Sequence, residues 1–244
     1  MTIFWDEKLE GSGYEEIWTG EVADSGCTVD EDADPSDVSS PANWGNDCLK
    51  CISADSTNQQ AYVGKTFASS YDPVYQRFEM VITGENLAND EKATIWKGAD
   101  TSWQVRFEIR LYQESGALLL KLFNSKTDYS DWEEIDGPAV SLNTLYRVEI
   151  EYDVAGGNLN WKVNGNSQTG TTPKGTEEFG RLEAGIRDQT GSGALTIYYD
   201  LIALDDADWI GAAGTTKSVA GSIPAMAGAL SKKLMAKRTV QGAI

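Results

Sequence analysis

Apolar and polar residues alternate along two runs in the middle of the chain. In the first run Val105, Phe107, Ile109 and Leu111 occupy every second position, and arginine or glutamate fills the positions between them. In the second run, residues 147–153, valine, isoleucine and tyrosine alternate with arginine, glutamate and aspartate. A period of two places successive side chains on opposite faces of a strand. Both runs therefore predict strands with one buried face and one solvated face.

Further apolar runs, separated by clusters of glycine, asparagine, aspartate and serine, predict more strands. They are Ile3–Trp5, Cys48–Ser53, Ala61–Phe67, Arg77–Thr83, Thr94–Lys97, Ala117–Asn124, Leu182–Arg187 and Leu195–Leu204, and residues 158–165 add a hairpin strand that ends on Asn-Gly. No long segment before residue 211 has a helical period. This pattern predicts an all-β fold in which two antiparallel sheets stack as a sandwich. The acidic segment 30–37 is expected to be a loop, which continues irregularly to residue 46.

The composition changes near residue 211, which predicts one domain over residues 1–211 and a C-terminal tail over residues 212–244. The tail is rich in glycine, small residues and lysine, and apolar residues recur in it every seven positions. Short Val-x-Gly-x-Ile strands and a helix over 225–238 are both compatible with this pattern. Neither form lets so short a segment bury its own apolar side chains, so we expect the tail to bind a partner. The residues expected to do so are Val219, Ile223, Met226, Leu230, Lys232, Lys233, Leu234, Lys237 and Arg238.

Charge and composition exclude several classes of function. The 244 residues carry a net charge of −18, and because the tail contributes +5, the remainder carries 15 basic and 38 acidic residues, or −23. Phosphate repulsion makes nucleic acid an unsuitable partner for such a body. The sequence has no histidine, which excludes Ser-His-Asp and Cys-His catalysis and the usual zinc sites. We expect no membrane insertion and no export signal, because no long apolar stretch and no basic leader are present.

The three cysteines are Cys27, Cys48 and Cys51. Side chains three positions apart on a strand point to opposite faces, so Cys48 and Cys51 are not expected to pair with each other. Buried free thiols are the first interpretation, and a bridge from Cys27 to one of the other two remains the alternative.

The order of these segments resembles laminin-G-like and concanavalin A-like jelly rolls. The resemblance rests on residues 103–111, 118–122, 145–152 and 159–165, and on a closing segment, 197–211, that is similar to the last strand of those domains. Residues 4–6 resemble their first strand, which pairs near the closing strand. The resemblance covers about residues 1–211 and implies a concanavalin A-like jelly-roll sandwich.

The recurring Gly-x-Ile/Leu pattern of the tail, with its lysines, resembles C-terminal extensions of bacteriophage virion proteins. This resemblance implies a non-enzymatic structural protein made in the host cytoplasm and displayed on the virion surface, as a capsid decoration protein, head fibre or tail-associated adhesin. Its implied partners are other virion proteins and further copies of itself. A carbohydrate-binding adhesin that recognises host-surface glycans is the first alternative.

Two sets of residues are candidates for ligand binding. Trp44, Trp103, Tyr129 and Trp132 lie in or next to expected loops, where aromatic rings stack on the apolar faces of sugars, although loop packing is the alternative. The second set supplies oxygen ligands for calcium, the one cofactor considered, and its alternative is a solvated charge run. Its members are Asp30, Asp32, Asp34 and Asp37.

A glycan hydrolase is the second alternative function, because laminarinases share this fold and carry Glu-x-Asp-x-Glu on one strand. The nearest match, residues 149–153, has its residue types out of order. Arg106 and Arg110 are instead expected to pair across strands with Glu149 and Glu151 on a solvated face. No catalytic residue is therefore predicted, and we expect no enzymatic activity.

Overall fold

The computed structural model describes residues 3–7, 18–34, 38, 44, 47–126, 131–191 and 193–210. This part of the chain contains strands and turns but no helix, and hence no helix long and apolar enough to cross a membrane. Its strands are β1 (Ile3–Glu7), β2 (Gly20–Ala23), β3 (Thr28–Ala33), β4 (Cys48–Ile52), β5 (Ala61–Tyr71), β6 (Val74–Glu85), β7 (Lys92–Ala99), β8 (Val105–Glu114), β9 (Ala117–Ser125), β10 (Trp132–Val140), β11 (Leu145–Asp153), β12 (Asn158–Val163), β13 (Asn166–Ser167), β14 (Phe179–Arg187) and β15 (Leu195–Asp205).

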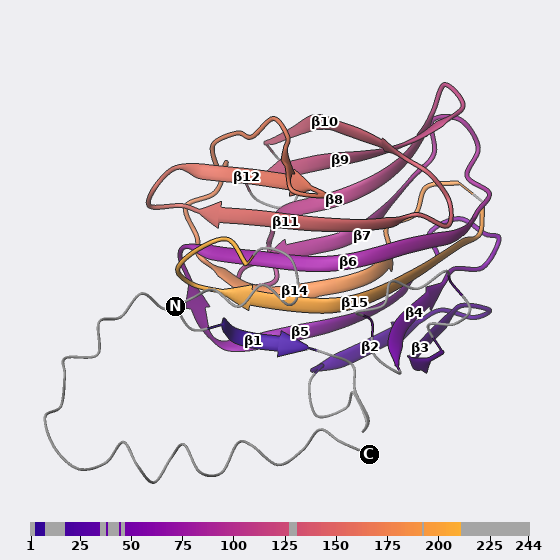
Figure 1. Cartoon of the computed structure of the whole chain (residues 1–244), viewed down its shortest axis with the longest axis horizontal. Helices are drawn as coiled ribbons and strands as arrows, with labels where there is room; N and C mark the ends of the chain where they lie inside the picture. Colours follow the sequence, from indigo (N-terminus) through magenta and orange to yellow (C-terminus); the bar gives the residue numbers. More distant parts are fainter. Residues whose placement is uncertain are drawn as a thin grey trace, which may run out of the picture. The chain divides into compact units, whose positions relative to one another are not determined.

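The strands form two antiparallel sheets that stack face to face (Figure 1). Sheet A has eight strands in the order β13-β12-β11-β6-β15-β4-β3, with β1 also paired to β15. Sheet B has seven strands in the order β10-β9-β8-β7-β14-β5-β2. Many spatial neighbours, such as β7 and β14, are far apart in the chain, as in jelly rolls. The expected all-β sandwich is confirmed.

The core lies between the two sheets and is built around stacked aromatic rings. Phe78 of β6 and Trp96 of β7 stack with ring centroids 4.0 Å apart, and Tyr199 of β15 packs against both rings. The Trp96 indole N–H donates to Gln76 Oε1 over 2.8 Å, and the Tyr199 hydroxyl donates to the carbonyl of Ile95 over 2.8 Å. Buried polar atoms that keep a hydrogen bond avoid the penalty of desolvation. The rings therefore join the two layers without leaving these polar groups unpaired.

The two ends of the sandwich domain meet in sheet A. β1 pairs antiparallel with β15, and the register sets Ile3 opposite Asp205 and Glu7 opposite Ile202. This pairing confirms the expectation that the first strand lies beside the closing strand. The two cysteines of β4 point to opposite faces of sheet A, as expected. Cys51 belongs to the main core, and Cys48 belongs to a separate, smaller apolar cluster.

Four strands that were not predicted join the sheets, each at an edge: β2, β3, β10 and β13. The expectation of a loop is wrong over residues 30–33, which belong to β3, and β3 pairs with β4 so that Asp30 lies opposite Lys50. β3 is an edge strand, and an edge strand can carry exposed acids without an alternating apolar pattern. β10 was missed because its pairing with β9 is irregular between Asp136 and Ala139, around a Gly-Pro pair.

The expected C-terminal tail, residues 212–244, lies outside the described residues, and with it every residue expected to bind a partner there. The two forms considered for the tail and its partner-binding role stay predictions. The sandwich domain, in contrast, is described to residue 210.

Candidate functional site

The polar side chains between the core positions of β8 are buried, not solvated. Glu108 is 0% exposed, and Arg106 and Arg110 on either side of it are also buried. The alternating pattern predicts the strand correctly, but the prediction of a wet polar face is wrong here. These three side chains belong to the outer face of sheet B, the face turned away from the core, and each forms an ion pair there.

The expected pairing of Arg106 and Arg110 with Glu149 and Glu151 is also wrong. β8 belongs to sheet B, whereas both of those glutamates lie on β11 in sheet A. Arg106 instead pairs with Asp100, in the turn between β7 and β8, and with Glu177. Strand pairing cannot be read from charge complementarity alone, because acids and bases on several strands complement each other equally well.

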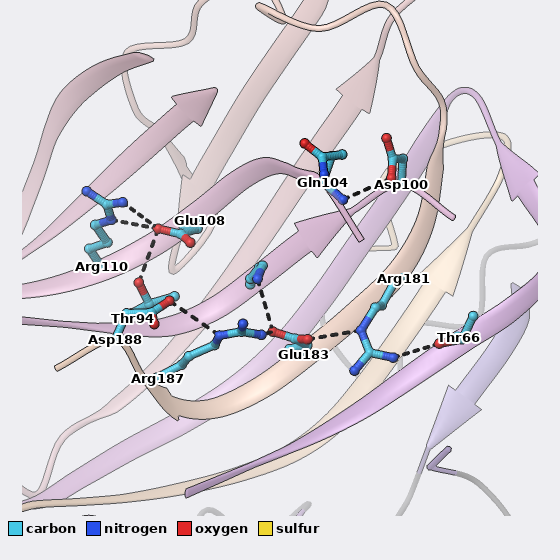
Figure 2. A network of polar contacts seen from close by, with 11 residues as sticks. Thr66, Thr94, Asp100, Gln104, Glu108, Arg110, Arg181, Glu183, Arg187 and Asp188 are labelled. Atoms are coloured by element: carbon cyan, nitrogen blue, oxygen red, sulfur yellow. Dashed lines mark hydrogen bonds and ion pairs between the residues drawn. The ribbon is translucent and has the colours of Figure 1, made fainter. Parts of the chain in front are cut away.

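Glu183 of β14 is the centre of an ion-pair network on this face (Figure 2). Its carboxylate accepts a hydrogen bond from Arg181 Nε over 2.9 Å and lies 3.4 Å from Lys97 Nζ, and it also pairs with Arg187. Arg187 in turn lies 3.3 Å from a carboxylate oxygen of Asp188. Burial by itself would raise the pKa of Glu183, but the adjacent Lys97 and Arg187 cations outweigh it and lower that pKa.

A second network surrounds Glu108. Arg110 donates to the Glu108 carboxylate from two nitrogens, each at 2.7 Å, and the Thr94 hydroxyl donates to the same oxygen over 3.1 Å. The other side of the Arg110 guanidinium lies 3.5 Å from Glu134 of β10. Charge-assisted bonds of this kind fix side-chain geometry. Three strands are thereby tied into one rigid polar surface.

A cavity opens at the end of this face where β7 begins. Its volume is about 320 Å³. It is lined by Asn58, Lys92, Thr94, Arg110, Asp188 and Thr190. The lining combines hydroxyls, an amide and opposite charges, which suits a polar ligand of small size or one part of a larger ligand.

Lys92 is the cation of the cavity that retains capacity for a ligand. Within the described ranges no carboxylate forms an ion pair with Lys92, and its ammonium donates to the Tyr112 hydroxyl over 3.0 Å. That hydroxyl donates onward to Glu134. Burial lowers the pKa of Lys92, with the nearby Arg110 cation acting in the same direction. Burial together with the Glu134 hydrogen bond raises the pKa of Tyr112, so the phenol keeps its proton.

Two of the four tryptophan and tyrosine residues expected to bind carbohydrate are exposed and contact this same face. Trp132, at the start of β10, stacks on Phe123 with ring centroids 5.6 Å apart. The Arg110 guanidinium also packs on Phe123, 3.4 Å from the centre of its ring. Trp103, in the turn between β7 and β8, lies over Arg181 at 3.6 Å. Each indole is thus held by a residue of the polar face, and each is more than half exposed.

The other two aromatic candidates do not join the face. Trp44 is buried in the smaller apolar cluster and donates its indole N–H to Glu79 over 2.9 Å, so its ring is not presented to a ligand. The expectation of a sugar-stacking role for Trp44 is therefore corrected to loop packing. Tyr129 lies outside the described residues.

The calcium candidates are only partly described. Asp30 and Asp34 are exposed, the side chain of Asp32 is not described, and Asp37 lies outside the described residues. Among the residues that the structure does describe, no group of three or more acids or cysteines is arranged to hold a metal ion. Calcium binding by the four aspartates stays a prediction.

Sequence reasoning missed the cavity, above all Lys92, and it missed Tyr112, whose hydroxyl accepts a hydrogen bond from Lys92. The available signal was the repetition of charged residues at alternate positions of three strands, β8, β10 and β14. A solvated face explains such a pattern equally well, and only the sheet order brings Asn58 and Thr190 beside Lys92.

No protein-family model and no curated protein sequence matches this chain. Solved structures of similar fold include the cellulose induced protein Cip1, at 15% identity and a TM-score of 0.60, covering 85% of this chain and 99% of that one. An alginate lyase from Klebsiella pneumoniae has 6% identity and a TM-score of 0.54, with 66% and 81% covered. The binding domain of botulinum neurotoxin DC in complex with SialylT has 13% identity and a TM-score of 0.51, with 75% and 43% covered. At these identities the likeness shows the fold, and the chain is a jelly-roll β-sandwich.

Proposed function

We propose that this protein binds a carbohydrate on the outer face of sheet B and that the ligand carries a carboxylate. The observation that carries the proposal is the cavity beside Lys92, a half-buried cation that forms no ion pair with any carboxylate of the described residues. An acidic sugar would supply that charge, and the hydroxyls and amide of the cavity would bond its hydroxyl groups. Alginate and SialylT in the names of similar structures support a carbohydrate as the ligand class.

The charges on the rest of the face favour binding over chemistry. Against the effect of burial, Lys97 and Arg187 lower the pKa of Glu183 and so hold it as an ionised carboxylate. The Glu108 carboxylate is engaged by two nitrogens of Arg110. A carboxylate fixed in this way is a poor general acid. Glu149, the carboxylate closest to the hydrolase pattern, lies on the other sheet and pairs with Arg147 at 3.6 Å. We therefore propose a binding protein without a reaction.

Isothermal titration calorimetry tests the proposal by comparing the affinities for oligouronates and for the corresponding neutral oligosaccharides. The protein should bind the acidic series, and Lys92→Met should weaken that binding at least about tenfold, since a hydrogen bond to a charged group contributes about 1.5–3 kcal/mol. Lys162→Met is the matched control, because Lys162 also packs on an aromatic ring, Trp209 at 3.6 Å, but lies on sheet A.

Equal affinity of Lys92→Met and the unaltered protein would overturn the assignment of the site, and binding of neutral glycans alone would overturn the charge argument. Release of new reducing ends or unsaturated products from the bound polysaccharides would replace a binding protein by an enzyme.

Display on a virion surface stays a prediction from the sequence, and a glycan-binding face is compatible with it. Deleting residues 212–244 tests it: the remaining domain should fold and keep its glycan binding but no longer join particles. Particle binding by the truncated protein would contradict the expected role of the tail.

A further inference from the structure

We infer that the ligand is an internal stretch of a polysaccharide, laid along β7 from the Lys92 cavity to Trp103, and that Trp103 forms a second, sugar-stacking subsite. The inference rests on the proposed function and adds the length and path of the ligand. It starts from the backbone conformation of Trp103, whose φ is +72°. A bulky residue in this region is an outlier, and such outliers concentrate at functional sites.

Core packing does not explain this conformation. Trp103 is 57% exposed, so the ring gains little from burial that would offset the unfavourable backbone angle. Large exposed apolar side chains are uncommon in the described part of the molecule, where Trp132 and Leu142 are the other two. An exposed ring in a disfavoured conformation is consistent with selection for contact with a ligand.

The turn that carries Trp103 is rigid. One oxygen of the Asp100 carboxylate accepts hydrogen bonds from the backbone N–H groups of Ser102, at 2.7 Å, and Gln104, at 3.0 Å. The Trp103 N–H donates to the Asp100 carbonyl over 3.1 Å. The second carboxylate oxygen of Asp100 pairs with buried Arg106 of β8. The ring is therefore presented in one position before any ligand arrives, which reduces the entropy lost on binding.

One face of the Trp103 ring is covered by Arg181, and the ion-pair network holds Arg181 in place. The Arg181 guanidinium lies 3.6 Å from the ring centre. Arg181 donates to Glu183 over 2.9 Å and to the Thr66 hydroxyl over 2.6 Å, so it cannot easily move away (Figure 2). An aromatic ring that is packed on one face and otherwise exposed is suited to stacking on the apolar face of a sugar ring.

The distance between the two subsites determines the kind of ligand. Lys92 begins β7 and Ala99 ends it, and seven residue steps at about 3.3 Å each span about 23 Å. Trp103 lies in the turn beyond Ala99, so it is at the opposite end of β7 from the cavity. One sugar ring cannot touch both subsites. A ligand that uses both must be a chain of several sugars aligned with the strand.

A series of acidic oligosaccharides of increasing length tests the inference by isothermal titration. Affinity should rise with length until the ligand spans both subsites. Trp103→Gly should abolish this rise, lowering affinity for long oligomers about tenfold or more while leaving affinity for the shortest one unchanged. Glycine adopts a φ of +72° without strain, so this variant should stay folded in a thermal melt. Trp103→Phe should keep much of the rise, and Leu142→Ala, outside the face, should keep all of it.

The inference fails if Trp103→Gly retains the full dependence on length, or if it weakens short and long oligomers equally. Either result leaves the proposed function standing, because binding at the Lys92 cavity would still be seen. If no acidic oligosaccharide of any length binds the unaltered protein, the proposed function itself fails and the second subsite with it.

Discussion

The replacement Glu183→Gln tests whether the outer face of sheet B is a buried ion-pair network. Gln keeps the size of the side chain and one acceptor oxygen but removes the charge that three cations share, Lys97, Arg181 and Arg187. Glu183 is 3% exposed, so water cannot replace the lost carboxylate. Removing one partner of a buried ion pair costs about 3–5 kcal/mol, because the remaining charges stay buried and uncompensated. We expect a loss of unfolding free energy in this range.

Urea denaturation followed by tryptophan fluorescence measures the loss, with Asp136→Asn as the matched control. Asp136 also pairs with a cation on this face, Lys121 at 3.0 Å, but its side chain is 82% exposed. Exposed pairs contribute at most about 1 kcal/mol, so the control should stay within that limit. Equal and small losses in both variants would refute the reasoning and support the solvated face that the alternating sequence pattern suggests.

The pH dependence of the same measurement supplies an independent check. The pKa of Glu183 is lower in the folded protein than its ordinary value, although burial opposes this, because Lys97 and Arg187 stabilise the carboxylate. A group with a lowered folded pKa contributes its stability above its unfolded pKa and loses it as the pH falls through the folded value. The difference between the unaltered protein and Glu183→Gln should therefore shrink in acid. A difference that is constant with pH would contradict an electrostatic origin.

Three further predictions follow from the core and the cavity. Gly98→Ala would place a Cβ atom 2.3 Å from the Phe107 ring and should lower the unfolding free energy by about 1–3 kcal/mol in urea denaturation. Phe78→Ala removes the ring stacked on Trp96 and should cost about 3–5 kcal/mol in the same assay, whereas a loss below 1 kcal/mol would show that the core closes around the gap. Affinity for acidic glycans should fall as the pH rises through the lowered pKa of Lys92, and Lys92→Met should show no such fall.

Several features of the fold could be predicted because they depend on local alternation. The strands around residues 105–111 and 147–153 were identified from their period of two, and the pairing of the first and last strands followed from the resemblance of both ends to jelly rolls. Edge strands were harder to identify. β3 contains three consecutive acids and β10 contains a Gly-Pro pair, so neither shows the pattern of a strand buried on one face.

The candidate site was only half visible in the sequence. Trp103 and Trp132 were identified as exposed aromatic residues near turns, and both lie where a ligand can reach them. Trp44 has the same residue type and an equally irregular setting, yet it is buried against sheet A. Residue type and a nearby turn do not determine exposure, because exposure depends on which other segment packs over the side chain.

The sequence by itself determined that apolar and polar residues alternate as in β-strands, that histidine chemistry is absent, and that the sandwich domain is acidic. The tertiary structure decided that the polar positions of sheet B are buried together as ion pairs and that Lys92 lies beside a cavity. The physical reason is that alternation is a property of one strand, whereas the environment of a charged side chain is set by the strands on either side. Those neighbours, β7 beside β14 and β8 beside β9 and β7, are fixed by the order of the sheet.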